Sequence, residues 1–366
     1  MGYLSYDLAH WIERLDTSSR VDHGFPLMEF AFCRRILAYD HSQSVWTAIE
    51  LLNEDAPSGN TARELENQLN VVAGAPNPKS GRLPALSGDL QSNFSRESYE
   101  KAVRKILGHI ASGDVYQVNL SQRFEGMLRI PPEELALRLL DLNPEPFSAF
   151  LSFGERAIVS SSPERFLRVH DRAVEAWPIK GTRPRGKTPE EDKRFLEELL
   201  ASDKDRAELV MITDLIRSDL GRVSATGSIR VPELRTAVSH SNVHHTLSRV
   251  TGRLRAEVDL ADLLRATFPG GSVTGAPKIK AMEIIETLEP TARGPYCGAI
   301  GYIGVDGTMD LNIAIRTVLC EGGRMTFQVG GGIVAESSPP DEFDETHQKA
   351  KGILKALGSN MDEFFK

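Results

Sequence analysis

The stretch Val115-Tyr-Gln-Val-Asn-Leu-Ser-Gln-Arg-Phe124 separates apolar from polar side chains with a period of two. One side carries Tyr116, Val118, Leu120 and Phe124, and the other carries Gln117, Asn119, Ser121 and Arg123. Side chains that alternate in this way lie on opposite faces of a β-strand. The stretch therefore predicts a strand with one apolar and one polar face.

Other periodic segments surround this strand. A helix is predicted after Ser95, which can cap it, and Gly113 can end it. Residues 309–320 alternate like a strand, residues 325–329 form another strand that runs into three glycines, and residues 340–357 read as a closing helix. Strands and helices are mixed without a strict strand-helix-strand rhythm. The pattern therefore favours an α+β fold over a doubly wound sheet.

The composition is that of an ordinary globular protein. Of the 366 residues, 40% are hydrophobic and 26% are charged. The net charge of −8 argues against nucleic acid as a partner. The three cysteines are too few and too scattered for a disulfide framework or a zinc site, and they fit a reducing cytoplasm. No signal peptide or run of eighteen apolar residues is visible, so no membrane association is expected.

The best linker candidate lies between Asn53 and Asn93, where Pro, Gly, Ser and Asn gather on both sides of a short charged helix at 61–70. We therefore expect an N-terminal region over residues 1–90 and one continuous catalytic domain over residues 91–366.

The stretch Trp177-Pro-Ile-Lys-Gly-Thr-Arg-Pro-Arg-Gly186 places a lysine between an apolar run and a Gly-Thr turn. Lys180 can be an ordinary surface charge, which is the common case. It can also be a desolvated amine that acts as a nucleophile.

Two segments expected to be helical carry pairs of carboxylates. Asp205 and Glu208 are three residues apart, and Glu342, Glu345 and Lys349 share one face of the closing helix. A hard divalent cation such as Mg²⁺ prefers carboxylates of this kind together with water and an anionic substrate. Solvated helix faces are the alternative, and on charge pattern alone they are the more common case.

Two glycine-rich segments offer backbone N–H groups to a ligand. Residues 269–278 form a loop that enters a helix near Pro277, an arrangement that suits an anion, although the spacing is not that of a P-loop. Gly330 to Gly332 follow a predicted strand, where a tight bulge is an equally good interpretation.

Three further residue types have candidate roles. Arg316, on the polar side of its predicted strand, can clamp a carboxylate bidentately or form an ion pair with one of the helix carboxylates. His244 and His245 are adjacent, and a catalytic role for one histidine is the less common outcome. Glu164 follows a predicted strand end and can serve as a general acid if burial raises its pKa.

Taken together, these segments resemble the chorismate-utilising enzymes, which include anthranilate synthase component I, aminodeoxychorismate synthase component I, and the isochorismate and salicylate synthases. The resemblance covers most of the chain. It rests on motifs in the expected order: Tyr116–Ser121, Ser161–Glu164, Pro178–Thr182, Asp214–Arg222, Pro269–Lys278 and Glu342–Lys349. It implies an α+β fold in which two large β-sheets pack as a sandwich with helices outside. It also implies that residues 1–90 are a partial N-terminal region that lacks the usual start.

Two positions separate the reactions within the family. Isochorismate and salicylate synthases have a lysine base where this chain has Gln117, and anthranilate synthases usually have alanine where it has Lys180. The resemblance is therefore nearest to aminodeoxychorismate synthase component I. It implies that Lys180 attacks ring carbon 2 of chorismate, so that ammonia is directed to carbon 4.

The resemblance also implies the remaining roles. Glu164 is expected to protonate the departing hydroxyl, and Mg²⁺ is expected to be held by Glu208 and Glu345, with Asp205 and Glu342 nearby. The enolpyruvyl carboxylate is expected to bind Tyr296, Arg316 and the amides of Gly330 and Gly332. The polar wall is expected to comprise Thr182, His245, Lys349 and Gln117.

The expected partner is a glutamine amidotransferase subunit that delivers ammonia. Two alternatives stay open: an anthranilate synthase component I with an unusual lysine, and an inactive chain that only binds an amidotransferase.

Overall fold

The structure of the chain is a computed structural model that describes residues 1–16, 19–51, 61–74, 85–240 and 243–358. The described residues fall into two compact units, one formed by Phe30–Gly81 with Met1, and the other by Gly2–Glu29 with Arg82–Lys366. The predicted linker over residues 53–93 lies partly outside the described residues. The domain boundary near residue 90 stays a prediction.

The smaller unit contains a β-hairpin and a helix. Strands β3 (Arg35–Asp40) and β4 (Val45–Glu50) pair antiparallel, and the helix α2 covers Thr61–Gly74. The rings of Tyr39 and Trp46 lie opposite each other across the hairpin, with centroids 4.8 Å apart. Arg35 forms ion pairs with Glu50 and Glu64, each at 3.1 Å. The short charged helix predicted at 61–70 is confirmed.

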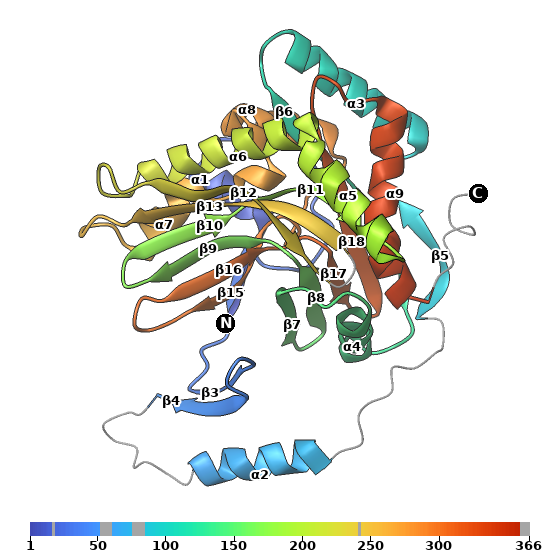
Figure 1. The fold of residues 1–366 in the computed structure, drawn as a ribbon. Coiled ribbons are helices and arrows are strands. Elements are labelled where there is room, and N and C mark those ends of the chain that lie inside the picture. Colours follow the sequence, from blue (N-terminus) through green and yellow to red (C-terminus); the bar gives the residue numbers. More distant parts are fainter. Residues whose placement is uncertain (17–18, 52–60, 75–84, 241–242, 359–366) are drawn as a thin grey trace. The chain divides into compact units, whose positions relative to one another are not determined.

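The larger unit contains two antiparallel sheets (Figure 1). Within the described residues, the first sheet has nine strands in the order β11-β13-β10-β9-β16-β15-β1-β2, with β12 paired to β13. Their bounds are β1 Gly2–Leu4, β2 Met28–Phe30, β9 Arg165–His170, β10 Ala173–Trp177, β11 Ile179–Pro184, β12 Arg230–Ser239, β13 Val243–Arg253, β15 Ala299–Ile303 and β16 Met309–Ile313.

The second sheet has seven strands in the described part of the chain, in the order β14-β6-β18-β17-β8-β7, with β5 paired to β6. Their bounds are β5 Leu86–Ser92, β6 Gln117–Leu128, β7 Phe147–Phe153, β8 Arg156–Ser162, β14 Gly275–Ala276, β17 Thr317–Glu321 and β18 Arg324–Ile333. The α+β class predicted from the sequence is confirmed.

The two sheets pack face to face. One apolar cluster takes Tyr3 and Ile300 from the first sheet and Ile158 and Leu319 from the second. Their strand neighbours Leu4 and Ala299 belong instead to the cluster under the helices. Because successive residues of a strand point to opposite faces, each sheet has one face in the sandwich and one face toward helices.

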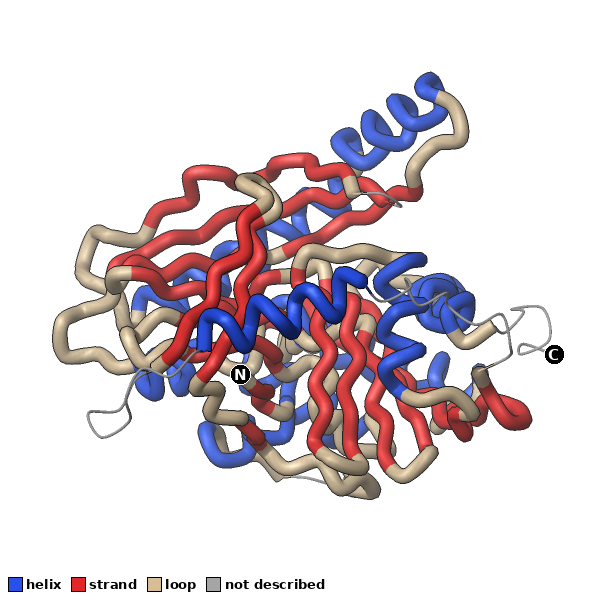
Figure 2. The backbone as a smooth tube through the Cα atoms, turned by 90° about the horizontal axis from the view of Figure 1, so that it is seen from below, coloured by secondary structure: helices blue, strands red, loops and turns tan. Residues whose placement is uncertain are grey.

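Helices cover the outer faces (Figure 1 and Figure 2). The first sheet packs against α6 (Asp203–Gly221) and α7 (Leu260–Thr267), and the second against α4 (Pro132–Leu142) and α9 (Pro339–Ala356). The remaining helices and 3₁₀ turns are η1 Tyr6–Leu8, α1 Ala9–Ile12, α3 Arg96–Ala111, α5 Pro189–Ala201, η2 Gly271–Val273 and α8 Lys278–Leu288. Among the described residues, none of the helices combines the length and apolar character needed to cross a membrane.

Several predicted elements are confirmed. The alternating run at 115–124 becomes β6, and the helix after Ser95 becomes α3, with a capping box between Ser95 and Ser98. The closing helix becomes α9 and the helix near Pro277 becomes α8. Both faces of β6 are buried: Gln117 on the polar face is 1% exposed and Val118 on the apolar face is 0% exposed.

The prediction of a single strand over residues 309–320 is wrong. Strand β16 ends at Ile313 in the first sheet, and β17 begins at Thr317 in the second. Arg316 lies in the turn between them, with φ of 50°. The alternation continues through the turn because both strands have buried faces, so a period of two does not reveal where the chain changes sheets. Arg316 therefore lies at the passage between the sheets.

A buried arginine ties the glycine-rich loop to β6. Arg293, 2% exposed, donates to Glu289, to the carbonyl of Val273 at 2.8 Å and to the carbonyl of Asn119 at 2.8 Å. Replacing Arg293 with methionine is expected to lower the free energy of unfolding by about 3–5 kcal/mol, because the buried Glu289 loses its cation. Chemical denaturation measures this loss. The matched change at the exposed Arg253 is expected to be nearly neutral, and equal midpoints for both variants would contradict the prediction.

Candidate active site

The pairing of β11 with β13 brings three predicted residues together. Lys180 lies opposite Thr246, and Thr182 lies opposite His245, with a register shift between the two pairs at Gly181. Gly181 has φ of 76°, and a Cβ there would lie 2.9 Å from Leu199 on α5. Only glycine tolerates this combination of backbone conformation and close approach. The bulge thus separates the Lys180–Thr246 pair from the Thr182–His245 pair.

His245 is a neutral, buried imidazole. It is 2% exposed, and its Nδ1 lies 2.9 Å from the Thr182 hydroxyl and 3.4 Å from the Gly181 carbonyl. Burial, and next the positive charge of Arg316, lower the pKa of His245 to about 3. Contact with the carbonyl favours a proton on Nδ1, which leaves Nε2 as an acceptor. Nε2 is buried without a hydrogen-bond partner in the described structure, as expected for an atom that meets a ligand.

Glu164 is a buried carboxyl with a pKa near neutrality. It follows β8, as predicted, and is 5% exposed. Burial raises its pKa to about 7, and three weaker effects oppose burial: a hydrogen bond from Ser272, the charge of Lys180 and the N–H of Ile179. A carboxyl that is part protonated and part ionised at neutral pH suits both general-acid and general-base catalysis.

The charge of Lys180 acts on this carboxyl and on carboxylates of two helices. The side chain is half-buried, and Nζ donates to the backbone carbonyl of Ser272 at 3.2 Å. Its positive charge lowers the pKa of Glu164, of Glu208 on α6 and of Glu345 on α9. Lys180 is therefore electrostatically coupled to both parts of the predicted site.

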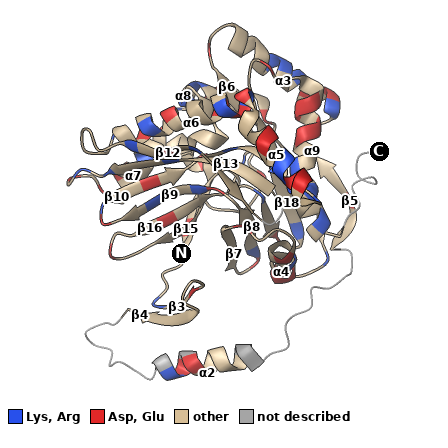
Figure 3. Cartoon of the chain, in the orientation of Figure 1, with Lys and Arg blue, Asp and Glu red and all other residues tan. Residues whose placement is uncertain are grey.

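The two predicted carboxylate pairs share electrostatic partners. Lys180, Lys204 and Lys349 act on both Glu208 and Glu345, and Glu342 is raised in pKa by burial, with a contribution from Glu345. Burial also raises the pKa of Glu208, and the negative charge of its neighbour Asp205 adds to this rise. In Figure 3 both signs of charge are visible along α9. A cation bound beside partly buried carboxylates of this kind stabilises their charged form.

The donor chemistry fits a hard divalent cation, but the donors are not assembled. No three described side chains among His, Cys, Asp and Glu stand close enough to hold a metal ion. Instead, the Lys349 ammonium contacts Glu345 at 2.7 Å and the carbonyl of Gly330 at 2.8 Å. A cation is thus already present at Glu345 in the form of a lysine side chain. A metal ion there would require Lys349 to move.

The predicted strand end at residue 329 is wrong, because β18 continues to Ile333 and pairs Gly330 to Gly332 with β6. These glycines are sterically required. A Cβ at Gly332 would lie 1.9 Å from Nε2 of Gln117, and a Cβ at Gly330 would lie 2.5 Å from the carbonyl of Leu120. The other amide atom of Gln117, Oε1, is buried without a hydrogen-bond partner in the described structure. Gln117 and Gly332 therefore form one packed contact in which an acceptor remains available.

Arg316 has a partner that the sequence did not indicate. Its Nη1 donates to Oε1 of Glu145, in the link between α4 and β7. Glu145 is buried, and its second oxygen, Oε2, has no hydrogen-bond partner in the described chain. Arg316 thus forms an ion pair, as one interpretation of the sequence expected, but not with either helix pair.

Tyr296 is a buried side chain. It is 4% exposed, burial raises its pKa well above the usual range, and the Arg293 guanidinium lies 6.0 Å from its ring centroid. The next residue, Cys297, donates its N–H to the Ala314 carbonyl at 2.9 Å. Tyr296 is therefore anchored beside the turn that carries Arg316.

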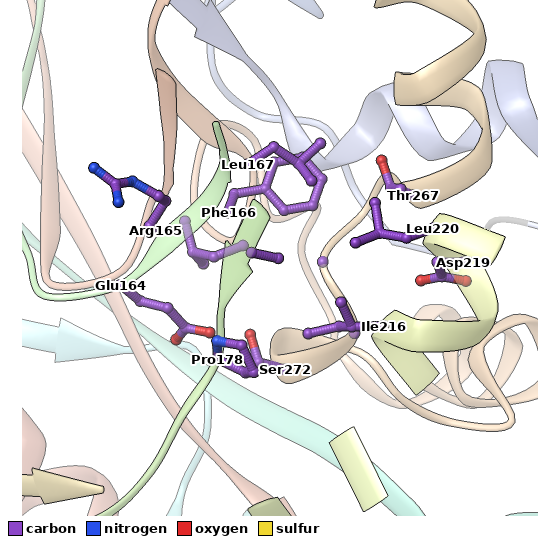
Figure 4. Close-up of a pocket in the computed structure, with 14 residues that line it drawn as sticks. Glu164, Arg165, Phe166, Leu167, Pro178, Ile216, Asp219, Leu220, Thr267 and Ser272 are labelled. Carbon is purple, nitrogen blue, oxygen red and sulfur yellow. The ribbon is translucent and has the colours of Figure 1, made fainter. Parts of the chain in front are cut away.

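A small pocket adjoins Glu164. Its lining joins strand β9 and helix α6 to the glycine-rich loop, and it includes Ile216, Asp219, Leu220 and Ser272. Figure 4 shows Glu164 and Ser272 pointing toward each other. Sequence reasoning marked the loop as an anion site but did not single out Ser272, because the spacing of glycines does not show which side chain meets a distant strand.

Comparisons with known proteins agree with this architecture. Residues 1–355 match the family described as chorismate binding enzyme. The chain is 43% identical over 364 residues to an anthranilate synthase component 1 from Thermus thermophilus, covering 98% of this chain and 77% of the relative. It is 40% identical over 365 residues to an aminodeoxychorismate synthase component 1 from Bacillus subtilis, covering 99% and 77%.

Among solved structures, an anthranilate synthase component I from Streptococcus pneumoniae superposes with a TM-score of 0.86 at 34% identity, covering 96% of this chain and 79% of that one. Relatives with the two activities are thus about equally similar to the chain. Overall similarity establishes the shared fold and leaves the choice between the two reactions to individual residues.

Proposed function

The chain belongs to the family of chorismate-binding enzymes, and we propose that it is a Mg²⁺-dependent aminodeoxychorismate synthase component I. The observation that carries the proposal is the position of the Lys180 amine, held at 3.2 Å from the Ser272 carbonyl and electrostatically coupled to the buried Glu164. A carboxyl with a pKa of about 7 can donate a proton to the group that leaves when the nucleophile attacks.

The proposed reaction divides one displacement into two. In its unprotonated form the Lys180 amine bonds to ring carbon 2 of chorismate while the carbon 4 hydroxyl leaves as water, with a proton from Glu164. Ammonia then bonds to carbon 4, the bond between carbon 2 and the lysine breaks, and Glu164 takes up the proton that ammonia loses. The amine on carbon 2 thereby directs ammonia to carbon 4.

The polar wall binds and orients the substrate. The acceptor Nε2 of His245, in the orientation fixed by Thr182, can receive a hydrogen bond from a ring hydroxyl. The enolpyruvyl carboxylate would bind Arg316, Tyr296 and the amides of Gly330 and Gly332. The free acceptor of Gln117 would face the substrate as well.

Glu208 and Glu345 would hold Mg²⁺, with Asp205 and Glu342 beside it, and the ion would neutralise and orient the ring carboxylate. The Lys349 ammonium, which pairs with Glu345 at 2.7 Å, would then turn toward the substrate. This assignment is consistent with the donor set, since all four are carboxylates on two helices.

Conversion of Glu208 or Glu345 to glutamine is expected to raise the Mg²⁺ concentration needed for half-maximal activity by at least about tenfold, because one anionic ligand is lost. Magnesium titrations of chorismate consumption measure this requirement. The matched control is Asp214→Asn on α6, whose side chain is 73% exposed. An unchanged magnesium requirement in both glutamate variants would contradict the assignment.

Anthranilate synthase component I is the second candidate, favoured by relatives such as the T. thermophilus protein at 43% identity. The deciding experiment identifies the product. The chain is incubated with chorismate, Mg²⁺ and ammonium, and the products are separated by chromatography with mass detection. Aminodeoxychorismate supports the proposal, whereas anthranilate would assign the chain to the second candidate.

Several relatives are named component 1, and we propose that this chain likewise receives ammonia from a glutamine amidotransferase subunit. Its three cysteines are free thiols, which fits the cytoplasm as the compartment of this reaction. A chain that only bound the amidotransferase would have no need of its substrate site. Calorimetry tests this alternative, because coupled binding of Mg²⁺ and chorismate is expected of the enzyme alone.

A further inference from the structure

Ser272 contacts both proposed reacting groups through two different atoms. Its backbone carbonyl accepts a hydrogen bond from Nζ of Lys180 at 3.2 Å, and its side chain lines the same pocket as Glu164 and lowers the pKa of that carboxyl. Figure 4 shows the Ser272 side chain beside that carboxyl. Lys180 belongs to β11 of the first sheet, and Glu164 lies in the link from β8 of the second sheet to β9 of the first, so Ser272 lies near two separate parts of the chain.

We propose that Ser272 is a positioning residue that holds the nucleophile Lys180 and the proton donor Glu164 at a fixed separation. This inference rests on the proposed function and adds a residue to it. Ser272 itself neither gains nor loses a bond in the reaction. It acts through the two groups it contacts, and the loop that carries it supplies the necessary rigidity.

The loop is fixed on both sides. A Cβ at Gly270 would lie 2.5 Å from Ile313 on β16, and a Cβ at Gly271 would lie 2.8 Å from Leu215 on α6. The loop is therefore wedged between a strand and a helix, and Ser272 within it is only 6% exposed.

Hydrogen bonds inside the loop add to this restraint. The hydroxyl of Thr274 donates to the carbonyls of Gly270 at 3.0 Å and Gly271 at 3.3 Å, and the carbonyl of Val273 accepts from Arg293 at 2.8 Å. A side chain held in this way keeps its two partners in place at little further loss of entropy.

The Ser272 hydroxyl lowers the pKa of Glu164. The groups facing Glu164 are Lys180 from β11, the N–H of Ile179, Ser272 and the thiol of Cys297. Burial raises the pKa of Cys297 to about 12, so the thiol is neutral near pH 7. Ser272, Lys180 and Ile179 favour the ionised carboxyl against burial. Removing the hydroxyl is therefore expected to raise the pKa of Glu164 above about 7.

The test is an infrared titration of the carboxyl in the free protein, with the Glu164→Gln variant as the blank. The wild type is expected to titrate near pH 7. In Ser272→Ala the midpoint is expected to rise by about one pH unit, as for one lost hydrogen bond to a charged group. Ser272→Thr keeps the hydroxyl and is expected to restore the wild-type midpoint. An unchanged midpoint in Ser272→Ala would overturn the proposal.

The matched control is Thr274→Val, which removes a hydroxyl of the same loop that bonds only to loop carbonyls. This change is expected to weaken the loop and leave the titration of Glu164 where it is. A merely structural role of Ser272 would make the two variants alike. Because the titration needs no substrate, its outcome is independent of which product the enzyme forms.

Turnover supplies the second readout. Ser272→Ala keeps the backbone carbonyl that holds Lys180 but is expected to misplace Glu164 relative to it, which lowers kcat by up to about a hundredfold with KM for chorismate little changed. Equal losses in Ser272→Ala and Ser272→Thr would contradict the role of the hydroxyl.

Discussion

Replacing Lys180 with alanine is expected to lower the formation of aminodeoxychorismate by on the order of 10³-fold or more, about 4 kcal/mol of transition-state stabilisation. Without the amine no covalent bond forms at ring carbon 2, and the remaining polar wall only binds chorismate. Any residual product is expected to carry its new nitrogen at carbon 2, since that carbon is no longer occupied. Chromatography with mass detection measures both the rate and the position of the nitrogen.

The matched control for this change is Lys187→Ala. Lys187 follows β11, its side chain is exposed, and its loss is expected to leave the rate within about twofold of wild type, as for ordinary surface changes. If Lys180→Ala makes the same product at the same rate as Lys187→Ala, the covalent mechanism is wrong.

Replacing Glu164 with glutamine is expected to lower kcat by about 10²–10⁴-fold, the usual contribution of a general acid–base group. Glutamine keeps the shape of the side chain but cannot transfer a proton. In the wild type, protonated Glu164 donates to the departing hydroxyl, so kcat/KM is expected to fall as the pH rises through the pKa of about 7. This alkaline limb is expected to disappear in Glu164→Gln.

The pH profile is measured at saturating free ammonia, so that the ionisation of ammonium does not contribute to the limb. Glu155→Gln, an exposed glutamate in the turn between β7 and β8, is the control and is expected to keep both the rate and the limb. Loss of the limb in Glu155→Gln as well would assign it to a different group.

Local periodicity predicted the elements that carry the site. Strand β6 and helices α3 and α9 lie where alternation and helical spacing placed them. Helices α3 and α9 each have one face against a core cluster, so their spacing reflects burial. Strand β6 is buried on both faces, and its alternation separates an apolar from a polar face. The run through Arg316 was misread because two strands of different sheets follow each other there with matching alternation.

The candidate site depended on a different kind of signal. Single residues such as Lys180 and Glu164 were ambiguous by themselves, and the order of motifs along the chain gave them their roles. Ser272 and Glu145 were missed because their partners, Glu164 and Arg316, lie more than a hundred residues away in the sequence. Contacts of that kind follow from the packing of the sheets and not from any local pattern.

The most direct measurement is the intact mass of the wild-type chain, quenched with acid during turnover with chorismate and Mg²⁺, before and after ammonium is added. The account predicts a mass increase equal to chorismate minus water, located on the peptide that contains Lys180, which is lost when ammonium releases aminodeoxychorismate. A chain that forms aminodeoxychorismate while remaining unmodified at every quench time would contradict it.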